Sequence, residues 1–371
     1  MPHFVIAFTG ILQTSVVFFL VLSVLVLIHE LGHFFVAKKI GVKVEEFGLG
    51  LPPRMKGWLF GETLYSLNWL PFGGFVKLFG EEANELKGIA LTAEQKAHSF
   101  AHKHPFKKLL VVVAGVFMNF LLGWFLLSIV IFNEGVPREM GRVRVEAIQS
   151  DSPASKIGLK KGDEILKVKD EGGELIIQKS QDLIDFSKKN GDKEVILFVT
   201  RDSKTTEVKI TPRLNPPAGQ GSLGLNITST SVVKLSVFEV PKESFLTSVK
   251  ISVMIFSEFG KMIAGVVTSG KVSGQVAGPV KIAQMTGEAA RGGWIELFYF
   301  MAMLSLNLSV INILPFPALD GGRGVFIMYE LITKKKPKAD WEAKINIVGF
   351  LFLISLIILV TVFDIISFIP R

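Results

Sequence analysis

Four uncharged apolar runs dominate the pattern of hydrophobic and polar positions along the chain. A helix that spans a membrane needs roughly 20 apolar residues. Residues 1–37 contain no Lys, Arg or Asp, and their only acid is Glu30. The sequence therefore predicts four spanning helices, of which the first continues past its apolar core: Phe4 to Val26, Leu109 to Phe132, Leu297 to Leu314, and Ile345 to Phe363.

The segment between the second and third runs has the alternating pattern of a small soluble domain. Alternation begins at Val143 and meets a turn at Ser152-Pro153. Strands bounded by Gly, Asn and Asp follow, with two short helices among them. The predicted elements are a helix from Ala154 to Gly158, a strand from Glu164 to Val168, a helix from Gln181 to Lys189, a hairpin of Glu194 to Thr200 with Thr206 to Thr211, and a last strand from Ser222 to Thr228.

A third kind of pattern covers Phe245 to Val267. Its apolar residues recur at helical spacing, but Lys250, Glu258 and Lys261 interrupt them. This favours an amphipathic helix on the membrane surface, with a tilted fifth span as the alternative.

Composition and charge support the membrane interpretation. The hydrophobic share is 49%, the charged share is 20%, and mean hydropathy is +0.45, whereas an average soluble domain has about 25% charged residues. The net charge of +8 does not indicate nucleic acid, because the loops beside the spans, 38–108 and 315–344, carry the basic residues expected of cytoplasmic loops, 11 and 6 in number. Positive loops face the cytoplasm. Both termini and the soluble domain are therefore predicted outside.

The most specific chemical pattern is His29-Glu30-Leu31-Gly32-His33. On a helix, residues four apart share a face, so both imidazoles can bind one metal ion. Glu30 is then placed to take a proton from water that the ion activates, without being a ligand. The alternative is a hydrogen-bonded polar cluster, but such groups are costly in a membrane unless paired or metal-bound.

A catalytic zinc site usually has three protein ligands and an open position. The chain has no Cys, which excludes thiolate ligands, disulfides and a cysteine nucleophile. His98, His102 and His104 lie in a basic polar loop, for which a solvated loop is the favoured interpretation. The best third ligand is Asp320 in "NILPFPALDGG", at the inner end of the third predicted span.

These motifs resemble the site-2 protease family. "HELGH" at the end of the first span, "NILPFPALDGG" after the third and a domain between them are most similar to its bacterial branch, the regulator-of-sigma-E-type intramembrane zinc proteases. The resemblance implies one Zn²⁺ on His29, His33 and Asp320, with Glu30 as general base. It also implies that Asn312 helps to hold substrate.

The soluble domain resembles a PDZ domain through "SDSPASKIGLKKGDEILKV", with "GSLGLNI" similar to the carboxylate-binding loop. The resemblance implies that the Leu223-Gly224 backbone binds a peptide end by strand addition. A spacer without a ligand is the alternative. The best-known members have tandem PDZ domains, whereas this chain has room for one.

Three further segments are candidates for handling substrate. The run 41–80 is rich in Gly and contains β-type stretches at Lys43–Phe47, Thr63–Leu67 and Gly74–Leu78, which suggests a re-entrant β element that pairs with extended substrate. A solvated hairpin is the alternative. Gly115, Asn119 and Gly123 form a small-residue stripe, and by resemblance Asn119 lies beside the metal. Gly278-Pro279-Val280 resembles a family segment that could be a hinge.

The sequence thus predicts a polytopic α-helical membrane protein with a membrane-associated β element and an inserted extracytoplasmic PDZ domain. The predicted parts are membrane core 1–140, PDZ domain 141–230, amphipathic linker 231–296 and membrane core 297–371. The predicted function is intramembrane zinc proteolysis of anti-sigma factors or remnant signal peptides. The predicted location is the bacterial cytoplasmic membrane, with the active site near its inner side. Partners would be transmembrane substrates, the lipid bilayer and peptide C-termini, with no nucleic acid. The rivals are a membrane scaffold with a structural metal and, less favoured, a metal transporter.

Overall fold

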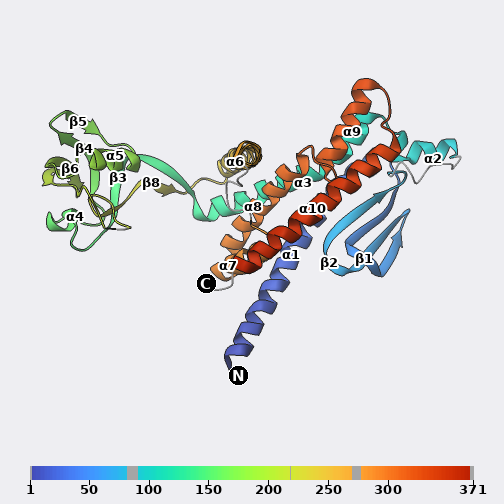
Figure 1. The fold of residues 1–371 in the computed structure, drawn as a ribbon, viewed down its shortest axis with the longest axis horizontal. Helices are drawn as coiled ribbons and strands as arrows, with labels where there is room; N and C mark the ends of the chain where they lie inside the picture. The colour runs from blue at the N-terminus through green and yellow to red at the C-terminus, as the bar shows by residue number, and fades with distance from the viewer. Residues whose placement is uncertain (1, 82–90, 218, 270–276, 368–371) are drawn as a thin grey trace. The chain divides into compact units, whose positions relative to one another are not determined.

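A computed structural model describes residues 2–81, 91–217, 219–269 and 277–367. The chain forms two compact units. The membrane unit consists of Met1–Asn133 and Val237–Arg371, and the second unit, which we call the PDZ-like unit after its sequence resemblance, is Glu134–Ser236. The predicted domain 141–230 lies within the second unit. Figure 1 shows the elements of both units.

Four helices of the described chain are long and apolar enough to cross a membrane, which confirms the predicted number of spans. They are α1 (Pro2–Lys39), α3 (Pro105–Glu134), α8 (Trp294–Ile313) and α10 (Ala339–Ser367). The first extends well beyond Val26, so that Lys38 and Lys39 lie in its last turn. Cations at this end of a helix interact favourably with the helix dipole.

The other helices of the membrane unit lie between these spans along the chain. The helix α6, within which the surface helix 245–267 was predicted, is longer than expected because it begins before Phe245, and it is not among the four span-like helices. A separate helix, α7, follows it and was not predicted. The bounds are α2 (Ala93–His98), the 3₁₀ turn η1 (Phe100–His102), α6 (Val240–Ser269), α7 (Pro279–Gly292) and α9 (Asp320–Thr333).

The core of the membrane unit joins α1, α3 and α8. Leu25, Leu127 and Leu306, one from each helix, are fully or almost fully buried together. The helix α10 differs, because the side chains of its apolar segment are mostly exposed. An exposed apolar helix of this length is accounted for when lipid is its solvent.

The β element is a single hairpin of β1 (Val44–Phe60) and β2 (Thr63–Leu78), visible beside the helices in Figure 1. Each strand bends back along its length, so the hairpin contains four paired segments, two from β1 and two from β2. The first part of β1 pairs on one side with 64–67 and on the other with 74–78. The three β-type stretches predicted from sequence lie in these strands, although the strands are longer. In the described pairing, residues 74–78 form an outer edge.

The PDZ-like unit contains a six-stranded antiparallel sheet of order β7-β6-β4-β3-β8, with β5 beside β4. Its single apolar core includes Val143, Ile165, Leu183 and Leu197. The bounds are β3 (Val136–Ile148), α4 (Pro153–Lys156), β4 (Glu164–Asp170), β5 (Gly173–Ile176), α5 (Ser180–Lys189), β6 (Val195–Arg201), β7 (Lys204–Ile210) and β8 (Leu225–Val233).

Two strands of this unit begin three or more residues from their predicted starts, and β5 was not predicted. The last strand begins at Leu225 rather than Ser222, because the amide of Gly224 bonds the carbonyl of Gly221 in a turn and Gly224 has a φ of 69°. The first strand begins seven residues before Val143. Its early part is an extension in which Val136 pairs with Val233, beyond the alternating core positions.

Candidate metal centre

Helix α1 carries His29 and His33 on one face, and close packing against α3 holds both rings. A Cβ at Gly32 would lie 2.7 Å from the carbonyl carbon of Ala114. A Cβ at Gly115 would lie 2.6 Å from Cε1 of His33 and 2.8 Å from Cε1 of His29. Real Cβ atoms do not approach this closely, so both glycines are required for the two helices and the imidazoles to fit together.

Asp320 is the first residue of α9, directly after the tight Pro-containing turn that follows α8. This turn folds against the start of α9, since a Cβ at Gly321 would lie 2.6 Å from the carbonyl carbon of Ile313. On the other side the turn packs against α10, where a Cβ at Gly349 would lie 2.9 Å from the carbonyl carbon of Pro317. The glycines therefore set where the Asp320 carboxylate lies.

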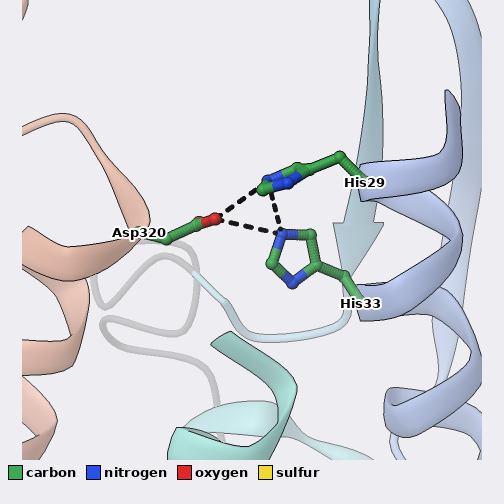
Figure 2. Close-up of side chains that lie close together, drawn as sticks. All are labelled: His29, His33 and Asp320. Carbon is green, nitrogen blue, oxygen red and sulfur yellow. Dashed lines mark hydrogen bonds and ion pairs between the residues drawn. The ribbon is translucent and has the colours of Figure 1, made fainter. Parts of the chain in front are cut away.

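Three candidate ligand atoms converge from α1 and α9, as Figure 2 shows. Oδ2 of Asp320 lies 2.9 Å from Nε2 of His29 and 3.4 Å from Nε2 of His33. The two Nε2 atoms are 3.2 Å apart. With zinc–ligand bonds of about 2.0–2.1 Å, neighbouring ligands of a tetrahedral site lie about 3.3 Å apart. The three observed distances fall close to this value.

The chemistry of the three atoms also fits a cation. Nδ1 of His33 lies 2.8 Å from the carbonyl oxygen of Val111, which only accepts hydrogen bonds, so this nitrogen carries the proton and Nε2 keeps a lone pair. Oδ2 of Asp320 is buried without a hydrogen-bond partner in the described chain. A lone pair and an unpartnered carboxylate oxygen facing one another are accounted for by a metal ion between them.

The ligand atoms open into a cavity of about 230 Å³, which we call the metal cavity. Glu30 lines this cavity beside His29. The edge segment of β2 forms the neighbouring wall, where Phe75 and Val76 line the cavity and Gly74 approaches the Glu30 side chain. The cavity thus contains a carboxylate that is separate from the three converging ligand atoms.

Asn119 on α3 contacts the far side of His29. Its side-chain amide lies 3.3 Å from Nδ1 of His29, and the residue is 1% exposed. Two serines of α8 hold this part of α3: Ser305 donates to the carbonyl of Asn119 at 2.7 Å, and Ser309 donates to that of Val116 at 2.9 Å. The Ser-x-x-x-Ser spacing within an apolar span was a signal for such contacts that the sequence reasoning missed.

The other predicted site residues lie elsewhere. Asn312 is half-buried near the end of α8 and is not among the described lining residues of the metal cavity. Leu223 and Gly224 lie in the turn before β8. The segment Gly278–Val280 begins α7, whose first amides donate to Asp364 of α10, 2.9 Å from the amide of Lys281.

The sequence reasoning also missed an ion pair in the wall of the metal cavity. Arg323 on α9 donates through Nη1 to Oε1 of Glu81, which follows β2. Both residues line the cavity. Arg323 comes one helical turn after Asp320, and this spacing was the available signal.

Two histidines and a carboxylate around a cavity, with a glutamate beside them, form the donor set of a metallopeptidase. Comparison with known proteins identifies the family. A model of peptidase family M50 matches residues 17–356, so the chain belongs to that family and is a zinc metalloprotease by class.

Similar proteins cover nearly the whole chain. A protein of Clostridium perfringens (strain 13 / Type A) is 35% identical over 347 residues, covering 94% of this chain and 97% of that protein. A protein of Clostridium acetobutylicum is 33% identical over 359 residues, covering 95% and 97%. A Fusobacterium nucleatum protein is 32% identical over 361 residues, covering 95% and 98%. All three are named as zinc metalloproteases.

A solved structure is similar to a smaller part of the chain. The crystal structure of the PDZ domain of an SdrC-like protein from Listeria monocytogenes matches with 20% identity and a TM-score of 0.21. The match covers 25% of this chain and 93% of that one.

Proposed function

We propose that this protein is an intramembrane zinc endopeptidase that hydrolyses peptide bonds within or next to transmembrane segments of its substrates. The observation that carries the proposal is the convergence of His29 Nε2, His33 Nε2 and Asp320 Oδ2 beside Glu30 in a unit with four span-like helices. When bound, one zinc ion supplies Lewis-acid polarisation of the scissile carbonyl and lowers the pKa of water.

In this proposal Glu30 is the general base. It takes a proton from the attacking water and gives it to the amine that leaves. Its place in the cavity wall supports this role, because it is close to the ligand atoms without being one of them. A scaffold with a structural metal would need His29, His33 and Asp320 but has no use for Glu30.

Asn119 would keep His29 in the form that binds metal. Oδ1 of Asn119 is buried and has no hydrogen-bond partner in the described chain. With the amide turned so that Oδ1 faces the ring, Nδ1–H of His29 donates to it and Nε2 keeps its lone pair. This orientation of the Asn119 amide gives the buried Oδ1 a hydrogen-bond donor. It also leaves Nε2 of His29 free to bind the metal.

Substrate would add as a strand to the outer edge of β2. A peptide bond is hidden while its segment is helical, so the substrate must become extended before attack. Residues 74–76 lie at an outer edge of the described strand pairing, and Phe75 and Val76 of this segment line the metal cavity. Main-chain pairing at this edge would therefore bring an extended segment to Glu30. For Asn312 we retain the substrate-holding role that the resemblance implies.

The proposed location is the bacterial cytoplasmic membrane, with the metal centre near the inner side. Basic residues in 38–108 and 315–344 support this orientation. It leaves both termini and the PDZ-like unit outside. Substrates consistent with this arrangement are anti-sigma factors already trimmed outside the membrane and remnant signal peptides.

The PDZ-like unit would bind free peptide C-termini, such as those an earlier cleavage creates. A groove of about 70 Å³ lies between α5 and β8 and includes Leu223 at its end. Behind the turn, Nε and Nη2 of Arg213 are buried without a hydrogen-bond partner in the described chain, and a Cβ at Gly224 would lie 3.0 Å from Nη2. A buried guanidinium next to this loop favours a carboxylate. Peptides with a free C-terminus should bind the full protein more tightly than amidated ones, and equal binding would contradict this role.

The protease proposal is tested by cleavage of a single-span substrate in detergent, with wild type and Glu30→Gln compared. We expect Glu30→Gln to retain about one zinc ion per chain and to lose about 10²–10⁴-fold in cleavage rate, the usual contribution of general acid–base catalysis. Equal cleavage by both proteins, or none by zinc-loaded wild type on several substrates, would favour the scaffold.

A further inference from the structure

One face of α9 carries a row of charged side chains, each matched to a partner on another element. Asp320, Arg323, Ile327 and Glu330 are three or four residues apart and therefore share that face. Asp320 faces the histidines of α1, and Ile327 is buried between the two ionic contacts.

The first ionic contact joins Arg323 to Glu81. Glu81 is itself fixed at the end of β2, since its Oε2 accepts from the amide of Leu78 at 3.2 Å and its own amide donates to the carbonyl of Leu78 at 3.1 Å. Arg323 and Glu81 line both the metal cavity and a second cavity of about 100 Å³. The ion pair thus lies in the wall that the two cavities share.

The second ionic contact joins Glu330 to Lys108, with Nζ and Oε2 2.8 Å apart. The Lys108 side chain is 7% exposed and that of Glu330 is 12% exposed, so water screens this pair weakly. Lys108 lies in the first turn of α3, the helix that also carries Gly115 and Asn119. The pair therefore links α9 to α3, the helix against which both histidine rings pack.

Packing of the turn before α9 places Asp320, but no hydrogen bond of the described chain holds the carboxylate oxygen that faces the histidines. Asp320 Oδ2 accepts no hydrogen bond from the described chain, and the N-cap residue Leu319 makes no side-chain hydrogen bond. The position of the Asp320 carboxylate relative to α1 therefore depends on the position of α9. Groups that orient a metal ligand typically account for 10–100-fold in metal affinity.

We infer that Arg323 and Glu330, through Glu81 and Lys108, are positioning residues that hold Asp320 at the distance from His29 and His33 at which it can bind the metal. The inference rests on the proposed metal site and deepens it. By this inference the charged residues of α9 raise the affinity for the metal, in addition to the stability that their ion pairs give the fold.

The test measures the zinc dissociation constant of the full chain in detergent, by competition with a chromogenic chelator. Arg323→Met and Glu81→Gln should each weaken zinc binding by about 10–100-fold. Arg323→Lys keeps a cation beside Glu81 and should recover most of the affinity. Lys209→Met is the matched control, because it removes an ion pair with Glu194 in the PDZ-like unit, 2.9 Å long, and should leave zinc affinity unchanged.

Two further measurements separate the possible outcomes. The Tm of the zinc-free variants reports a structural effect: a lower Tm with unchanged zinc affinity would overturn the inference.

The variant Asp320→Asn separates failure of this inference from failure of the proposed function. If Asp320→Asn weakens zinc binding and Arg323→Met, Glu81→Gln and Glu330→Gln do not, the inference fails and the metal site stands. If Asp320→Asn binds zinc as wild type does, Asp320 is not a ligand and both fail. Should Arg323→Met not fold, Glu81→Gln and Glu330→Gln decide.

Discussion

In the PDZ-like unit Val143, Ile165 and Leu197 are fully buried, whereas in the membrane unit the apolar side chains of α10 face outward and Asn119 and Ser305 are buried. The first arrangement is driven by removal of apolar surface from water. The second has lipid as its solvent, so helices associate through small residues and hydrogen bonds instead. A buried polar residue in the membrane unit is therefore either a packing contact or part of the site. The experiments below test this contrast between the two units and the site in the membrane unit.

The largest expected effect comes from removing a proposed metal ligand. His33→Ala should lower the zinc content from about one ion per chain to near zero and abolish cleavage, because two ligands do not retain zinc. Hydrogen exchange in the PDZ-like unit should not change. His98→Ala is the control, since this exposed ring contacts the carbonyl of Gly41 outside the metal cavity. Full zinc content in His33→Ala would show that the metal lies elsewhere.

Next in size is the loss of a buried apolar side chain in the PDZ-like unit. Leu197→Ala should destabilise that unit by about 2–5 kcal/mol, since it removes a fully buried side chain and leaves a cavity. Leu356→Ala on α10 removes an exposed leucine and should cost no more than about 0.5 kcal/mol. Urea unfolding followed by hydrogen exchange measures the first, and Tm in detergent the second. Equal costs would remove the contrast between the units.

A smaller effect is expected from one methyl group beside the histidines. In Gly115→Ala the new Cβ would overlap both imidazoles, and a displacement of about 1 Å can cost about 100-fold in rate. The rate of substrate cleavage measures this. Gly260→Ala is the matched control: it lies in α6 with no atom within 4 Å of a new Cβ, and its activity should equal that of wild type. A fully active Gly115→Ala would contradict the packing described for α1 and α3.

The smallest effect concerns pH and the PDZ-like unit. Hydrogen bonds from Arg201 lower the pKa of the Asp163 carboxyl, with Nε 2.7 Å from Oδ1. A depressed folded-state pKa contributes stability that is present above the unfolded value, near 3.9, and is lost as pH falls through the folded value. Asp163→Asn should therefore lower the urea midpoint of residues 134–236 at pH 7 and lose this difference in acid. A difference that persists at low pH would assign it to another cause.

Local pattern predicted what depends on neighbours in sequence. The four spans, the placement of His29 and His33 on one helix face, and the strands of the PDZ-like unit other than β5 follow from periodicity. The choice of Asp320 needed the topology as well, because it required two spans to end on the same side.

What could not be predicted depends on contacts between distant segments. The double fold of β1 and β2 is set by pairing on both sides of one strand, which no local pattern specifies. The ion pair of Arg323 with Glu81 joins residues 242 positions apart. The final strand of the PDZ-like unit was placed three residues early because Leu223 and Leu225 both fit an alternating pattern, and only the turn at Gly224 separates them.

Mapping the cleavage site by mass spectrometry tests the central claim most directly. A purified single-span substrate is incubated with zinc-loaded wild type and with Glu30→Gln, and the new termini are identified. We predict new termini within or directly beside the apolar span with wild type and none with Glu30→Gln. Termini confined to a soluble part of the substrate, or the same termini with both proteins, would contradict the claim.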